Sequence, residues 1–132
     1  MSEKIFHYIH HAAFWLEVEG KRALFDPFLD GNPEHLRAQD IDADWIFVSH
    51  AHADHLGSAF EIAQRTGATI ISTAEICGLA GQAGCASHAM HIGGTHEFAF
   101  GKVRIAPAFH GSGIAGGHAC GFIVNFFGIR LY

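Results

Sequence analysis

A run of metal-capable side chains directly follows the most apolar segment of the chain, and this arrangement constrains the fold most. Residues 45–49 read Trp-Ile-Phe-Val-Ser, which is typical of a strand buried on both faces of a sheet. The side chains that follow are His50, His52, Asp54 and His55. Because open α/β sheets bind ligands at the carboxyl ends of their strands, the sequence predicts a metal site at this edge.

The spacing within this run suits two neighbouring ions. His50 and His52 are two residues apart, so in an extended segment their rings point to the same side. Asp54 and His55 follow where the chain turns toward a helix, and this pair can hold a second ion close to the first. Nitrogen and oxygen donors suit Zn²⁺, and also Mn²⁺ or Fe²⁺. We expect one or two divalent ions, with zinc as the first choice. The alternative is a histidine-rich surface loop without a function.

The remaining pattern predicts a single α/β domain over residues 1–132. A helix over Gly57–Arg65 and a second buried strand over Ala68–Ser72 follow the metal-capable run. This strand–helix–strand order favours a parallel pair with a right-handed crossover. The other expected elements are strands at 5–9, 13–18, 22–25, 103–109 and 122–127, a short helix opened by Asn32-Pro33, and a short helix at 75–79.

The composition limits the partners and the compartment. There are 12 His but only 8 Lys and Arg against 13 Asp and Glu, a net charge of −5, which argues against a general nucleic-acid binder. No apolar run reaches the roughly 18 residues of a membrane span, so we expect no membrane partner. The three cysteines (Cys77, Cys85 and Cys120) are odd in number and widely spaced. They favour a reducing cytoplasm over a disulfide scaffold.

The sequence His-Ala-His-Ala-Asp-His at 50–55, placed after a buried strand, resembles the signature of the metallo-β-lactamase superfamily. The resemblance covers nearly all 132 residues. Within the superfamily, the chain resembles a widespread branch of metallo-β-lactamase-like, metal-dependent hydrolases. Beyond the signature, the resemblance rests on the segments 20–28, 31–33, 65–71, 92–94 and 106–110.

This resemblance implies specific ligands for two ions. His50, His52 and His110 match the three histidines of the family's first metal site. Asp54 and His55 match ligands of the second site. Asp54 is also the candidate catalytic group, because it could hold or relay a proton during hydrolysis.

Three further residues are implied or considered near the site. His11 matches a family histidine close to the metal centre. Asp26 matches an acidic residue that supports the metal-binding loop from behind the ligands, as carboxylates that orient ligating imidazoles do. His118 lies in a glycine-rich stretch and is a candidate for contact with substrate.

The chain also departs from the family pattern. Members continue with a second half that supplies a metal-bridging aspartate and a further histidine, whereas this sequence stops at Tyr132. The resemblance implies a four-layer αββα sandwich, of which we expect only the N-terminal half: about one mixed β-sheet with flanking helices. A fragment, a natural half-protein and a decayed homologue all fit. Because a half would leave apolar surface uncovered, we expect a homodimer or a complementary C-terminal half.

Two functions from different classes remain. The first is a metal-dependent hydrolase, in which a metal-bound hydroxide attacks an ester, lactone, amide or phosphodiester of an unidentified small-molecule substrate. The second is a non-catalytic metal-binding half-domain that acts through association. The number of ions held and the presence of turnover separate them.

Overall fold

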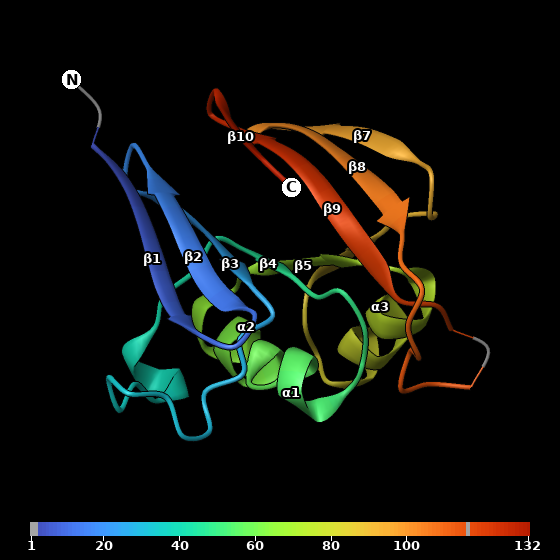
Figure 1. The fold of residues 1–132 in the computed structure, drawn as a ribbon, viewed down its shortest axis with the longest axis horizontal. Helices are drawn as coiled ribbons and strands as arrows, with labels where there is room; N and C mark the ends of the chain where they lie inside the picture. Colours follow the sequence, from blue (N-terminus) through green and yellow to red (C-terminus); the bar gives the residue numbers. More distant parts are fainter. Residues whose placement is uncertain (1–2, 116) are drawn as a thin grey trace.

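The computed structural model describes residues 3–115 and 117–132, and it contains two β-sheets that face each other (Figure 1). The first sheet has the strand order β1-β2-β3-β4-β5-β6, and the second has the order β10-β9-β8-β7. The strands of the first sheet are β1 (Lys4–His10), β2 (Ala13–Val18), β3 (Lys21–Phe25), β4 (Trp45–Phe47), β5 (Thr69–Ser72) and β6 (Ser87–Ala89). Those of the second are β7 (Thr95–Phe98), β8 (Gly101–Pro107), β9 (Cys120–Phe126) and β10 (Ile129–Leu131). The helices are α1 (Ala53–Leu56), α2 (Ala59–Thr66), α3 (Ala74–Gln82) and a 3₁₀ turn, Ala38–Asp40.

The first sheet is mixed, as predicted. β1, β2 and β3 pair antiparallel, whereas β3, β4, β5 and β6 pair parallel. The predicted strand–helix–strand unit is confirmed as β4, α2 and β5, with Ile46 opposite Ile70. Both isoleucines lie in the core under the helices, together with Ile62 of α2 and Ile76 of α3. The apolar character of 45–49 therefore reflects a strand that is covered on both faces.

The chain forms a second sheet in addition to the one that was expected. The α/β class is confirmed, but the expectation that this chain supplies about one sheet is too low, because β7–β10 form a separate antiparallel sheet. Its inner face packs on the first sheet, and the rings of Phe47 and Phe122 meet at 5.2 Å between centroids. Alternation identifies a strand but not the sheet that it joins, since strand pairing is decided by contacts distant in sequence.

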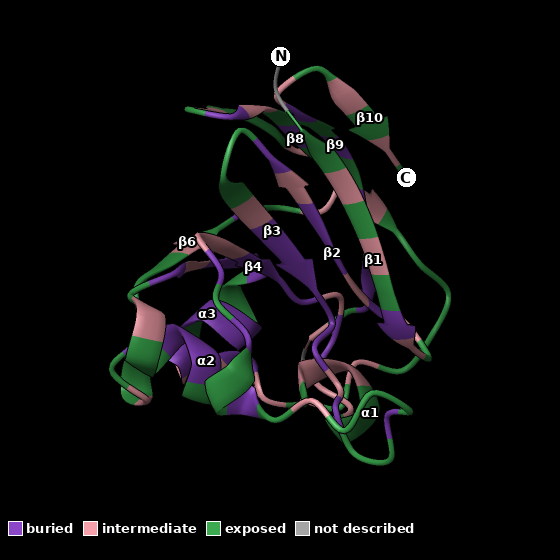
Figure 2. Ribbon diagram, turned by 90° about the vertical axis from the view of Figure 1, so that its left-hand side faces the viewer, coloured by how far each residue is buried: buried purple, intermediate pink, exposed green. Residues whose placement is uncertain are grey.

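The layers are helix, sheet and sheet. Burial, coloured purple in Figure 2, follows the facing surfaces of the sheets and the inner sides of α2 and α3. Within the described residues, no helix covers the outer face of the second sheet, where Lys102, Arg104 and Asn125 are exposed. No helix in residues 3–115 and 117–132 combines the length and the apolar character needed to cross a bilayer.

The predicted helix after Asn32 does not form. The Asn32 side chain instead accepts hydrogen bonds from the backbone N–H groups of Glu34 (3.1 Å) and Leu36 (3.0 Å) and thereby closes a loop. Asparagine is as well suited to such turns as to helix N-caps, so the residue type alone did not separate the two.

Candidate metal centre

Four loops meet at one edge of the first sheet. Because β3 and β4 are parallel, the residues that follow them, Asp26 and 48–57, leave the sheet at the same end. β2 runs antiparallel to β3, so the β1–β2 turn that carries His11 lies at this end as well. The loop between β8 and β9, which carries His110, arrives from the second sheet.

The first group of candidate ligands comprises His50, His52 and His110. One ring nitrogen of each lies within 4.8 Å of the others, although His110 is 60 positions from His50 in sequence. The ring centroids of His50 and His110 are 4.8 Å apart, and those of His52 and His110 are 5.2 Å apart. Three imidazoles at this spacing can share one divalent ion and leave a coordination position open.

Backbone contact brings the β8–β9 loop to the signature loop. The backbone N–H of Ala51 donates to the carbonyl of Ser112 at 2.7 Å. Gly113 has φ +78°, and a Cβ there would lie 2.8 Å from the carbonyl carbon of Ala51 and 2.8 Å from the backbone nitrogen of His52. Glycine at this position therefore allows both the left-handed conformation and the close approach that holds His110 in the group.

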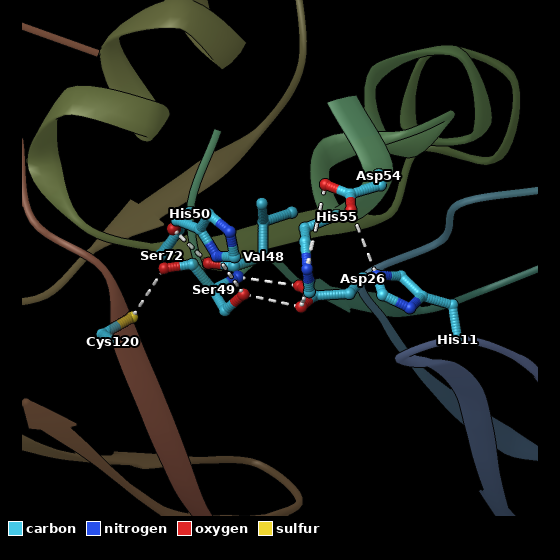
Figure 3. Close-up of polar contacts among 9 residues, drawn as sticks. All are labelled: His11, Asp26, Val48, Ser49, His50, Asp54, His55, Ser72 and Cys120. Atoms are coloured by element: carbon cyan, nitrogen blue, oxygen red, sulfur yellow. Dashed lines mark hydrogen bonds and ion pairs between the residues drawn. The ribbon is translucent and has the colours of Figure 1, made fainter. Parts of the chain in front are cut away.

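A buried carboxylate supports the loop from behind (Figure 3). Asp26 accepts hydrogen bonds from the Ser49 N–H (2.8 Å), the Ser49 hydroxyl (2.6 Å) and His55 Nδ1 (2.8 Å). The Ser49 hydroxyl also lies 2.9 Å from His50 Nδ1. Since this hydroxyl donates to Asp26, it accepts from His50 Nδ1–H, which leaves the lone pair of His50 on Nε2.

His50 fits a metal ligand on an observation independent of the signature. Its Nε2 is buried and has no hydrogen-bond partner in the described part of the chain, while the residue is 5% exposed. Burial, with the positive charge that neighbouring His55 can carry, lowers the pKa of His50 to about 4. The imidazole is therefore neutral at pH 7. A buried, neutral nitrogen with an unused lone pair is the form in which histidine binds divalent metals.

The second group comprises His11, Asp54 and His55, whose candidate ligand atoms also lie within 4.8 Å of one another. His11 Nε2 lies 3.2 Å from one Asp54 carboxylate oxygen, and His55 Nε2 lies 3.9 Å from the other. The hydrogen bond to Asp26 raises the pKa of His55 against the effect of burial. Desolvation acts to raise the pKa of Asp54, but the charge of His55, a backbone hydrogen bond and His11 together outweigh it, so this pKa is lowered.

The two groups are neighbours. The ring centroids of His50 and His55 are 4.1 Å apart, and both rings are linked to Asp26, directly or through Ser49. Of the residues considered from sequence, His118 is exposed and belongs to neither group. Ser49 was missed, although its polar side chain at the end of an apolar strand was a usable signal. That these residues bind metal stays a prediction.

Comparisons with known proteins agree with this geometry. The family model described as the metallo-beta-lactamase superfamily matches residues 9–123. A UPF0173 metal-dependent hydrolase of Natranaerobius thermophilus is 49% identical over 126 residues, covering 95% of this chain and 57% of the relative. A UPF0173 metal-dependent hydrolase of Carboxydothermus hydrogenoformans is 45% identical over 132 residues, covering 95% of this chain and 58% of the relative.

A solved structure agrees as well. Igni18, described as a novel metallo hydrolase from Ignicoccus hospitalis, superposes on this chain with a TM-score of 0.80 at 31% identity. The superposed region covers 99% of this chain and 59% of the Igni18 chain. The chain thus spans less than three fifths of the length of these relatives. With a match over most of its residues, on a fold that gathers the signature side chains at one edge, the chain belongs to the metallo-β-lactamase superfamily.

Proposed function

We propose that this chain provides the metal centre of a hydrolase that cleaves an ester, lactone, amide or phosphodiester bond in a small molecule. The observation that carries the proposal is the pair of three-residue groups joined through Asp26. Single clusters of histidine and carboxylate are common on protein surfaces. Two adjacent clusters that share one buried carboxylate are a more specific arrangement, and they favour hydrolysis assisted by two ions.

The residues of the first group would hold one ion, and Asp54 and His55 would contribute to a second. An ion bound there would lower the pKa of a coordinated water to about 7 and polarise the oxygen of the scissile group. His50 is kept oriented by Ser49 and is neutral without having to lose a proton. Asp54 is half-exposed, so its carboxylate would be accessible to accept a proton and pass it to a leaving group.

Zinc is the proposed metal, with manganese or iron as alternatives, because the set contains histidine nitrogens and one carboxylate and no thiolate. The three cysteines are free and buried, and Cys120 lies behind the site with its thiol 3.3 Å from the Ser49 carbonyl. Free thiols support the proposal of a reducing, cytoplasmic compartment.

A partner is part of the proposal. An apolar cleft of about 170 Å³ opens between the two sheets, beside the buried Asp26. Its lining includes Phe14, Phe25, Phe122, Leu131 and Tyr132. Apolar surface of this kind favours association, so we propose that a second copy covers it, with a complementary chain resembling the remaining part of the relatives as the other outcome.

The alternative function is a non-catalytic metal-binding module that acts through association. It needs only the first group, His50, His52 and His110, to hold an ion. It predicts a single, weakly held ion and no turnover.

The test combines metal content, mass and hydrolysis. Metal-free protein is reloaded with Zn²⁺, Mn²⁺ or Fe²⁺ and assayed with p-nitrophenyl acetate, a simple lactone and bis(p-nitrophenyl) phosphate, while light scattering compares its mass with the 14.3 kDa of one chain. We expect metal-dependent turnover that His50→Gln abolishes and that His35→Gln, at an exposed histidine outside both groups, leaves unchanged. Turnover that survives complete removal of metal contradicts the mechanism.

A further inference from the structure

We propose that His11 is a direct ligand of the second ion, so that this chain supplies three ligands for that ion without help from another segment. The inference deepens the proposed function and rests on its assignment of Asp54 and His55 to a second ion. The family resemblance placed His11 only near the metal centre. The geometry points to a closer role, because one of its ring nitrogens lies within 4.8 Å of ligand atoms of both Asp54 and His55.

The backbone around His11 is built to present its ring. The pairing of β1 with β2 shifts between Tyr8 and His10, and the chain turns back at residues 11 and 12. His11 adopts φ +51°, a left-handed conformation that histidine takes more readily than most residues. The Tyr8 hydroxyl donates to the carbonyl of His11 at 2.9 Å, which fixes the turn.

The ring itself is confined from two sides. The ring of Phe28 meets it edge-on at 6.0 Å, and the ring of His55 lies 4.9 Å away. The Asp54 carboxylate faces both histidines, as the dashed lines in Figure 3 show. His55 uses Nδ1 for its hydrogen bond to Asp26, which leaves Nε2 as its candidate ligand atom. The three facing donors are therefore two imidazole nitrogens and one carboxylate oxygen, a set that divalent transition metals accept.

A simple ion pair between His11 and Asp54 explains this arrangement less well. The His11 side chain is 45% exposed and that of Asp54 is 51% exposed, and ion pairs between groups this exposed contribute little to stability. The pair alone also gives no reason for His55 Nε2 to face the same carboxylate. A shared ion accounts for all three side chains.

The experiment counts ions in a variant that keeps the turn. His11→Asn suits the left-handed conformation but is too short to reach the ion position. Metal-free wild type, His11→Asn and His7→Ala are titrated with Zn²⁺ by calorimetry, and with Co²⁺ while its visible absorption is recorded. His7 is the matched control, because it lies on β1, the strand that leads to His11, pairs with Glu34 at 2.7 Å and belongs to neither group.

We expect two ions in wild type and in His7→Ala. In His11→Asn the first ion should bind as before, while the second binds at least about tenfold more weakly and the spectrum of the second Co²⁺ equivalent changes. Two ions bound to His11→Asn with wild-type affinity and spectrum would overturn the role of His11 and leave the proposed function standing. A wild type that binds only one ion would overturn both the role of His11 and the two-ion function. Loss of both ions in His11→Asn, with circular dichroism unchanged, would also contradict the assignment to the second ion alone.

Discussion

The two ligand groups differ in depth and in support. The first contains His50, which is buried, oriented through Ser49 and left with an unused nitrogen, together with the half-buried His52 and the exposed His110. The second places His11 and Asp54 in half-exposed positions, and only its His55 is anchored to Asp26. Because preorganised, desolvated ligands bind more tightly than exposed ones that must be ordered, we expect a tight first ion and an exchangeable second one.

The largest predicted effect comes from Asp26, which the two groups share. Asp26→Ala leaves the Ser49 hydroxyl, the Ser49 N–H and His55 Nδ1 without their acceptor. Since each orphaned group costs about 1–3 kcal/mol, we expect on the order of 4 kcal/mol lost in the free energy of unfolding, and weaker binding of both ions. Urea unfolding and metal titration measure these effects.

The control for this variant is Asp30→Ala, which removes an exposed carboxylate from the same loop. It should leave stability and both affinities near wild type. If Asp26→Ala weakened only one ion, the carboxylate would not be the common support, and the two groups would be independent.

A second prediction uses pH to separate the groups in metal-free protein. The pKa of His50 is about 4 in the folded state and about 6.5 when unfolded, so its contribution to stability is present above pH 6.5 and is lost as pH falls toward 4. The full loss is on the order of 3 kcal/mol. His55 acts in the opposite sense: its raised pKa stabilises the fold below pH 6.5, and this contribution is lost as pH rises.

The measurement is the free energy of unfolding between pH 7 and pH 4 for wild type and His50→Gln. We expect the decline on acidification to be shallower in His50→Gln, because glutamine does not take up a proton. Parallel curves would show that His50 is not the buried neutral group of the first site.

Only part of the fold and of the candidate site could be predicted from the sequence. The signature at 50–55 and its strand were predictable because both are local in sequence. His110, in contrast, was assigned only through the family resemblance. No local sequence pattern relates it to the other candidate ligands, which lie more than 50 positions away in sequence. Ser49 and the contact of Ser112 with Ala51 depend on how loops meet, and the second sheet depends on strand pairing. Such contacts are non-local and leave little trace in residue type.

A third prediction tests whether the approach of the β8–β9 loop maintains the first group. In Gly113→Ala the new methyl group would meet the backbone of Ala51 and His52, and the left-handed φ would add strain. We expect about 2 kcal/mol lost in stability and weaker binding of the first ion, because His110 moves with the loop.

Gly128→Ala is the matched control, since Gly128 has φ +88° with no atom within 4 Å of the new Cβ. It should cost about 1 kcal/mol and leave metal binding unchanged. Equal effects of the two variants on metal affinity would show that the close approach is unimportant.

The smallest predicted effect is that of metal removal on the Cys120 thiol, which lies on the core side of the first group. Burial, with a smaller effect of the Asp26 charge, raises the pKa of Cys120 to about 12, so at pH 8 its thiolate is scarcer than that of an ordinary cysteine by about a thousandfold. We expect iodoacetamide to modify Cys120 far more slowly in the native protein than in urea, as peptide mapping by mass spectrometry would measure. Metal removal should leave this rate nearly unchanged if the hydrogen bonds of Asp26 and Ser49 alone keep the region closed. A large acceleration on metal removal would mean that the ion itself maintains the first group, and the contrast in preorganisation between the two groups would then disappear.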